Sequence, residues 1–144
     1  FCDEARRRRP DVAFGADIIA GFPTETESAH SQTMAMIRDV GISYLHVFPY
    51  SPRPSTPAAE MPQLDAAVIK QRAGALRELG KVQLHEYLRA AIGKTDRMLV
   101  ESGNVGHGKN FTKIRLDQPF VPVSSLVDVK IYGRDQDMLL AHAV

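Results

Sequence analysis

The sequence lacks several features that would each define a class of protein. It has a single cysteine, Cys2, among 144 residues, so it forms neither an internal disulfide framework nor a metal site built from cysteines alone. No stretch approaches the roughly 18 consecutive apolar residues of a membrane-spanning helix, and the Arg-rich start is unlike an apolar secretory signal. We therefore expect no membrane partner and a cytoplasmic location. The formal net charge is only +1, so nucleic-acid binding would need local clusters of basic residues.

The first nine residues have the pattern of the last turns of a helix, which Pro10 would end. Because the chain begins with Phe1 and not with methionine, we interpret it as a piece of a longer protein. Residues 6–9 are four consecutive arginines. Such a run occurs in RNA-binding patches, but a solvated helix end, where the helix dipole favours cations, explains it more simply.

Residues 11–50 have the pattern of a strand, a helix and a second strand. The first apolar run, residues 11–22, is short enough for a buried strand. Thr24 with Glu27 has capping-box spacing, although Thr26 is also eligible as N-cap, and Gly41 would end the helix. Residues 42–50 are β-branched and aromatic, as in a second buried strand. This order predicts a right-handed βαβ unit with parallel strands.

The remainder divides into a loop, a helix and a β-rich tail. Residues 51–62 contain four prolines and are expected to lack regular structure. Residues 64–92 have a helical pattern, in which Gly74 and Gly80 favour a kink or a break. Short strand patterns follow at 98–101, 111–116, 126–131 and 138–143, with glycines and prolines between them, as in a small barrel or sandwich. We predict three parts: residues 1–62, α/β; residues 63–92, a helical connection; and residues 93–144, all-β.

Two candidate sites follow the two predicted parallel strands, at residues 17–26 and 46–56. Ligands in parallel α/β folds bind beyond the carboxyl ends of strands, and Gly21 would let a ligand approach the backbone. A plain connecting turn explains the first segment equally well. Arg53, between Pro52 and Pro54, is either an anion clamp or a solvated loop cation. His46 is interpreted as a histidine inside the core.

A candidate RNA-binding segment lies in the β-rich tail. If residues 109–115 form a strand, then Lys109, Phe111, Lys113 and Arg115 share one face. An aromatic ring among cations suits RNA, through stacking on a base and contacts with phosphates. The alternative is a solvated strand with Phe111 turned into the core. Because residues 94–144 carry seven basic and six acidic side chains, binding should be modest and sensitive to salt.

The two candidate sites resemble a known family. DIIAGFPTETE, residues 17–27, resembles the D-I-I-V-G-F-P-G-E-T segment of radical S-adenosylmethionine methylthiotransferases, and YLHVFPYSPRPSTPAAEMP, residues 44–62, resembles their F-x-Y-S-x-R-x-G-T-x-A-A-x-M segment. Both occur in the family's order and separation. Residues 45–50 are most similar to the branch that acts on N6-threonylcarbamoyladenosine at position 37 of tRNA. Residues 93–144 resemble a TRAM domain, the RNA-binding β-barrel of these enzymes.

The resemblance implies the C-terminal portion of a radical SAM partial (β/α) barrel followed by a small TRAM barrel. It implies S-adenosylmethionine and [4Fe–4S] clusters as cofactors of the whole enzyme, with tRNA and an electron donor as partners. The cosubstrate would be bound near the two strand ends, by Ile19, Gly21, Phe22, Glu25, Val47, Phe48, Tyr50 and Arg53. The RNA-binding residues would be Lys109, Phe111, Lys113 and Arg115. The whole enzyme would transfer sulfur and then methyl to C2 of the adenosine.

The sequence departs from the family pattern in two respects. Thr24 and Ser55 stand where the family usually has glycine. The C-x3-C-x2-C motif, whose three thiolates hold the cluster and leave one iron open, is absent. We therefore expect no catalytic residue or metal ligand in this chain and no activity from it alone. Three alternatives stay open: methylthiolation of isopentenyladenosine in tRNA, methylthiolation of a ribosomal protein, and a non-catalytic RNA-binding module.

Overall fold

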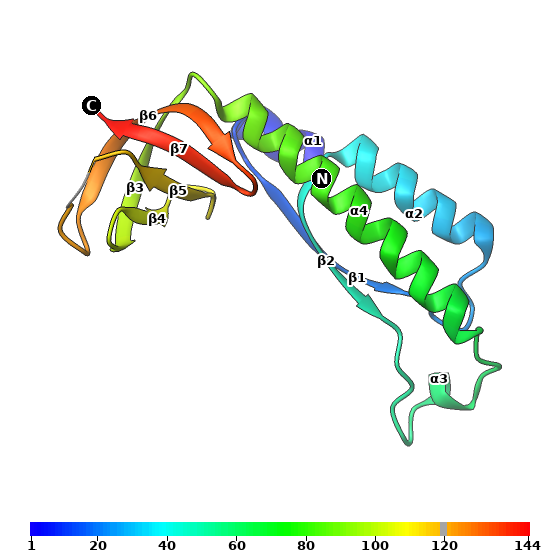
Figure 1. Ribbon diagram of the computed structural model, residues 1–144. Coiled ribbons are helices and arrows are strands. Elements are labelled where there is room, and N and C mark those ends of the chain that lie inside the picture. The colour runs from blue at the N-terminus through cyan, green and yellow to red at the C-terminus, as the bar shows by residue number, and fades with distance from the viewer. Residues whose placement is uncertain (119–120) are drawn as a thin grey trace. The chain divides into compact units, whose positions relative to one another are not determined.

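The computed structural model describes residues 1–118 and 121–144 (Figure 1). These residues form two compact units, residues 1–83 and residues 84–144, and the division falls inside the longest helix, α4 (Ala66–Ala91). Within the described residues, no helix combines the length and the apolar character needed to cross a membrane.

The first unit contains the predicted strand, helix and strand. Strands β1 (Phe14–Ala20) and β2 (Ile42–Pro49) pair in parallel, and helix α2 (Glu27–Val40) connects them. At their carboxyl ends Ile19 lies opposite Phe48, and Ala20 lies opposite Pro49. The two strand ends are therefore neighbours at one edge of the sheet, as the sequence predicted.

Helix α2 begins two residues later than the capping box at Thr24 suggested. Thr26 is the N-cap, and its hydroxyl accepts a hydrogen bond of 3.1 Å from the amide of Ala29. Gly41 ends the helix in the left-handed conformation, with φ of 64°. Thr26 was the alternative N-cap in the sequence prediction. With Thr26 as N-cap, Glu25 precedes the helix.

The short helix α1 (Cys2–Arg8) is a solvated helix end, with one arginine packed against the unit. Arg6 donates to the carbonyl of Val40, and its guanidinium lies 4.7 Å from the centre of the Phe14 ring. Arg8 contacts Glu4 at 2.7 Å on the exposed side. These internal contacts support the simpler interpretation of the arginine run.

Helix α4 is continuous, and the expected break at Gly74 or Gly80 does not occur. Each internal glycine costs about 1 kcal/mol relative to alanine, which the burial of an apolar face offsets. Gly80 has a packing role, since a Cβ there would lie 3.1 Å from Cβ of Leu45. The core of this unit consists of buried residues from the sheet, α2 and α4: Ala20, Ile37, Ile42, Ala73, Leu76 and Leu79.

The proline-rich loop contains one turn of helix, α3 (Pro57–Glu60), where the sequence predicted no regular structure. Pro57 occupies the first turn of α3. Proline is tolerated there because the first amides of a helix have no partner within the helix.

The second unit is a closed barrel of five strands in the order β3–β4–β5–β7–β6. The strands are β3 (Thr95–Ser102), β4 (Val105–His107), β5 (Lys113–Leu116), β6 (Leu126–Asp135) and β7 (Met138–Ala143). Their inward side chains and Leu88 of α4 form the core: Met98, Val100, Ile114, Leu116, Val129, Ile131, Leu139 and Ala141. A small β-barrel was one of the two predicted arrangements.

The barrel differs from the prediction at two places. Strand β4 was missed, because its three residues include a glycine and carry no apolar alternation. The strand predicted from residue 111 begins only at Lys113, because Phe111 lies in a turn with φ of 56°.

Candidate functional site

The two faces of the β1–β2 sheet have different surroundings. Ala16, Ile18, Leu45 and Val47 point to one face and pack against the core with α2 and α4. The side chains at alternate positions point to the other face and are exposed: Asp17, Ile19, His46 and Phe48. His46 is therefore on the exposed face and not in the core, which corrects the sequence interpretation. The apolar side chains of Ile19 and Phe48, at the carboxyl ends of the two strands, are therefore exposed to solvent.

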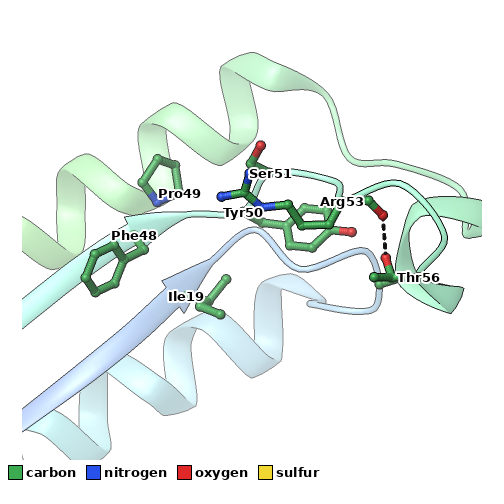
Figure 2. A pocket seen from close by; sticks show the side chains of 8 residues that line it. Ile19, Phe48, Pro49, Tyr50, Ser51, Arg53 and Thr56 are labelled. Carbon is green, nitrogen blue, oxygen red and sulfur yellow. Dashed lines mark hydrogen bonds between the residues drawn. The ribbon is translucent and has the colours of Figure 1, made fainter.

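A cavity of about 420 Å³ opens where the two strands end (Figure 2). Ile19 of β1 lines it together with Phe48, Pro49, Tyr50, Ser51, Arg53, Thr56 and Ala58 of β2 and the loop after it. The amide of Tyr50 donates a 2.8 Å hydrogen bond to the carbonyl of Ala20, which holds the two strand ends together. Both candidate segments therefore contribute to a single cavity.

The loop after β2 forms the polar wall of this cavity. The hydroxyl of Thr56 donates a 2.8 Å hydrogen bond to the carbonyl of Arg53, drawn in Figure 2. The Arg53 side chain is exposed and forms no ion pair with any residue of the described ranges. It is a cation on a mostly apolar cavity, available to an anionic group of a ligand.

Ser55 adopts the left-handed conformation, with φ of 65°, whereas Thr24 has no positive φ. Left-handed φ costs a residue with a side chain about 1–2 kcal/mol, and glycine adds about 0.5–1 kcal/mol of chain entropy. We expect Ser55→Gly to raise the free energy of unfolding by about 0.5 kcal/mol and Thr24→Gly to lower it. Urea titration of both variants tests this, and a Ser55→Gly variant less stable than Thr24→Gly would contradict it.

The segment after β1 supports the cavity from outside its lining. Gly21 has φ of 81°, and a Cβ there would lie 2.7 Å from Cγ1 of Ile69 on α4. The rings of Phe22 and Tyr50 meet edge to face, with their centres 5.3 Å apart. The first segment thus positions Tyr50, while only Ile19 of that segment reaches the cavity.

The carboxylate of Glu25 is hydrogen-bonded by other residues of the α/β unit. Its side chain is only 12% exposed, and its carboxylate accepts hydrogen bonds from the amide of Gly21 and, at 3.2 Å, from Arg72. Arg72 also donates to the backbone carbonyl of Glu25 at 2.7 Å and reaches Glu27 at 3.2 Å. Nδ1 of His30 lies 3.4 Å from the same carboxylate. These contacts tie the turn after β1 to α4.

Of the eight predicted cosubstrate residues, four line the cavity: Ile19, Phe48, Tyr50 and Arg53. The other four are not among the lining residues: Gly21, Phe22, Glu25 and Val47. Val47 packs into the core, and its carbonyl accepts a 3.2 Å hydrogen bond from Arg77. Arg72 could not be predicted as a partner of Glu25, because it lies 47 residues away and inside an ordinary helical pattern.

The four predicted RNA-binding residues do not form one strand face. Lys113 and Arg115 alternate outward on β5, whereas Lys109 and Phe111 precede the strand in the turn. The positive φ of Phe111 prevents a continuous strand there. Phe111 is 85% exposed, so its ring is not part of the barrel core, and Arg115 pairs with Asp135 at 3.0 Å.

An ion pair links β3 and β6 on the outer surface of the barrel. Arg97 Nε lies 2.7 Å from Asp128, and this hydrogen bond holds the pKa of the Asp128 carboxyl below its usual value and raises the pKa of Arg97. Its contribution to stability is therefore present at neutral pH and is lost as pH falls through the pKa of Asp128. Both groups are exposed, so the contribution is small.

Sequence comparison relates the chain to enzymes that act on tRNA. It is 42% identical over 136 residues, 94% of its length, to the threonylcarbamoyladenosine tRNA methylthiotransferase MtaB of Rickettsia prowazekii. It is 43% identical over 95 residues, 65% of its length, to a tRNA-2-methylthio-N(6)-dimethylallyladenosine synthase of Ehrlichia chaffeensis, and 32% identical over 136 residues to the enzyme of that name from Sphingopyxis alaskensis. The chain belongs to the tRNA methylthiotransferase family.

The chain spans only part of each methylthiotransferase it matches. The aligned residues cover 32% of the Rickettsia protein, 31% of the Sphingopyxis protein and 22% of the Ehrlichia protein. No protein-family model matches the chain. The assignment of the chain to this family therefore rests on these pairwise similarities, and the longest alignment covers both the α/β unit and the barrel.

Proposed function

We propose that this chain is part of an enzyme that uses S-adenosylmethionine to convert N6-threonylcarbamoyladenosine at position 37 of tRNA into its 2-methylthio derivative. In this proposal residues 1–62 are the C-terminal part of a radical SAM partial (β/α) barrel, residues 63–92 a connection and residues 93–144 a TRAM-like barrel. The observation that carries the proposal is the cavity that both family motifs line, with Ile19 from the first and Phe48 to Arg53 from the second.

The cavity suits the adenosine side of S-adenosylmethionine. A volume of about 420 Å³ lies within the usual range for small-molecule sites, about 300–1,000 Å³. Ile19 and Phe48 offer apolar surface to an adenine ring. When bound at a [4Fe–4S] cluster, S-adenosylmethionine supplies the radical chemistry that activates C2 of the target adenosine. The role of this chain is to bind and orient.

The cluster itself does not fit the residues of this chain. Three thiolates hold such a cluster, and the sequence has one cysteine, Cys2. Within the described ranges, no three His, Cys, Asp or Glu side chains come together as a metal site. The cluster ligands, and the donors of sulfur and electrons, would come from elsewhere in the enzyme or the cell.

The choice of the threonylcarbamoyl substrate rests on two observations. Over alignments of 136 residues each, the chain is 42% identical to the Rickettsia relative named for threonylcarbamoyladenosine and 32% identical to the Sphingopyxis relative named for dimethylallyladenosine. The threonylcarbamoyl group carries a carboxylate and the dimethylallyl group carries no charge. Arg53, an exposed cation at the cavity wall, gives a carboxylate a partner.

The substrate assignment is tested by mass spectrometry of tRNA nucleosides from the source organism after deletion of the gene. We expect 2-methylthio-N6-threonylcarbamoyladenosine to disappear and its unmethylthiolated precursor to accumulate, with the isopentenyl derivatives unchanged. Loss of the methylthiolated isopentenyl nucleoside instead would assign the chain to the other tRNA branch. If both methylthiolated nucleosides persist, the proposed function is wrong.

Phe48→Ala should abolish most complementation of that deletion. Phe48 is 52% exposed, so its removal takes apolar surface from the cavity without emptying the core. We expect at least a tenfold lower yield of the methylthiolated nucleoside, because about 1.4 kcal/mol of lost ligand contact is tenfold in affinity. Met36→Ala, an exposed apolar residue of α2 at 42%, is the matched control and should complement fully. Equal complementation by both variants would remove Phe48 from the site.

For the barrel, we propose tRNA contacts through Lys109, Phe111, Lys113 and Arg115. Lys113→Ala combined with Arg115→Ala should weaken tRNA binding by the chain about tenfold and reduce the slope of log affinity against log salt by about 1.4–1.8, the loss of two phosphate contacts. Filter binding across salt concentrations measures both. Arg38→Ala with Lys70→Ala removes the same charges from the other unit and should leave the slope unchanged. Identical slopes for the two double variants would exclude β5 from the RNA site.

A further inference from the structure

The outer surface of strands β5, β7 and β6 carries a second group of basic and aromatic side chains. Pairing places β7 between the other two strands, with Leu140 opposite Arg115 on one side and His142 opposite Lys130 on the other. Side chains alternate, so those at Arg115, Leu140, His142 and Lys130 point away from the core that Ile114, Leu139, Ala141 and Ile131 form. The result is one continuous outward face.

At the centre of this face two rings are stacked. The rings of Tyr132 and His142 have centres 5.9 Å apart and an interplanar angle of 15°. Tyr132 is the additional residue of an irregularity in β6, where the register shifts between Ile131 and Gly133. Such a bulge redirects a side chain, and Tyr132 stays 48% exposed. The pair presents flat aromatic surface that the barrel core does not use.

The charges around the rings favour a polyanion. Lys130 lies across from His142 on this face, whereas Arg134, beyond the irregularity, is opposite the buried Leu139 and donates to the carbonyl of Gln136. Lys113 extends the basic character to β5, where the charge of Arg115 is paired with that of Asp135. The carboxylates of these strands are engaged by arginines, Asp128 by Arg97 and Asp135 by Arg115. An acidic partner therefore meets cations around a stacking surface.

We propose that the stacked Tyr132–His142 pair is a base-stacking platform for a single-stranded segment of the RNA, with Lys130 contacting a flanking phosphate. Stacking on aromatic rings beside backbone-tracking cations is how single strands are bound without reading sequence. The inference deepens the proposed RNA-binding role of the barrel and depends on it. The proposed RNA-binding surface would then run from the β4–β5 turn, through Lys113 and Arg115 on β5, across β7 to β6.

The experiment compares Tyr132→Leu with Tyr132→Phe in the full 144-residue chain, using a 12-nucleotide oligoadenylate as probe. Leucine keeps the apolar bulk and removes the ring, whereas phenylalanine keeps the ring and removes only the hydroxyl. We expect the leucine variant to bind at least about fivefold more weakly, the low end of one lost base stack, and the phenylalanine variant to bind like the original chain. A duplex of the same length should not distinguish the variants. Equal binding by all three proteins overturns the platform.

A second readout uses the unaltered chain. On saturation with oligoadenylate, NMR signals of the Tyr132 ring should move upfield, as rings under a stacked base do, while those of Tyr44 in the other unit should not. Tyr132 signals that stay fixed at saturation overturn the platform even if a variant proves unstable. If Lys113→Ala with Arg115→Ala weakens binding while Tyr132 is inert, the platform alone is wrong. If the chain does not bind RNA at all, the proposed barrel function and the platform both fail.

Discussion

Replacing Gly106 with alanine should unfold the barrel. A Cβ at this position would lie 1.8 Å from the carbonyl oxygen of Leu99, 2.8 Å from its carbonyl carbon and 3.0 Å from Cε of Met98. The nearest obstacle is backbone of β3, the strand that pairs with β4 with Val100 opposite Gly106. That backbone cannot shift without breaking the pairing, so the usual cost of overpacking, about 1–3 kcal/mol, is a lower bound.

The measurement for Gly106→Ala is thermal unfolding followed by circular dichroism, together with the dispersion of barrel amide signals in NMR. Gly133→Ala is the matched control on β6, because its Cβ would meet nothing closer than 3.9 Å, at Cδ1 of Leu140. We expect the control to fold and the Gly106 variant to lose dispersed barrel signals. A folded Gly106→Ala barrel with unchanged stability would mean that β3 and β4 are not paired as described.

Arg72→Met should be the most damaging substitution in the α/β unit. It removes the charged partner of Glu25, whose side chain is only 12% exposed, while Arg72 itself is 9% exposed. Removing one partner of a buried ion pair leaves an uncompensated charge and typically costs about 3–5 kcal/mol. The turn after β1 also loses the bond from Arg72 to the Glu25 carbonyl, so the Tyr50 side of the cavity should loosen with it.

The double variant Arg72→Met with Glu25→Gln separates charge from packing. Glutamine removes the buried charge but can still accept the hydrogen bond from the Gly21 amide. Urea unfolding should show the double variant more stable than Arg72→Met alone by at least about 1 kcal/mol, the coupling expected of contacting residues. A double variant as unstable as the sum of the two single variants would show that the pair does not interact.

The sequence predicted what local pattern encodes. The β-branched run before Tyr50 and the capped, glycine-ended helix before it predict a strand and a helix, and the structure confirms both. Their parallel pairing follows from the order of elements. Because the motifs lie at the strand ends, four of the residues predicted to bind the cosubstrate line the cavity, and their binding role stays a prediction: Ile19, Phe48, Tyr50 and Arg53.

The sequence could not predict features that depend on close approach between distant segments. Strand β4 has Gly106 at its centre because the backbone of Leu99 leaves no room for a side chain there. In the sequence alone, a glycine at this position indicates a turn and not a strand. The alternation of residue types predicted a strand through Phe111, but the positive φ of Phe111 is incompatible with a strand, and β5 begins at Lys113. The Arg72–Glu25 contact joins residues 47 positions apart, and nothing in either local pattern indicates it.

Protein-detected methyl NMR at Ile19 tests the central claim most directly, that the ends of β1 and β2 form a single cavity for the adenosine part of S-adenosylmethionine. The chain is titrated with S-adenosylhomocysteine, and the methyl signals of Ile19 at the cavity and Ile114 in the barrel core are followed. We expect a saturable shift at Ile19, none at Ile114, and loss of the Ile19 shift in Phe48→Ala. An Ile19 signal that does not move, at ligand concentrations up to the solubility limit, would contradict the central claim.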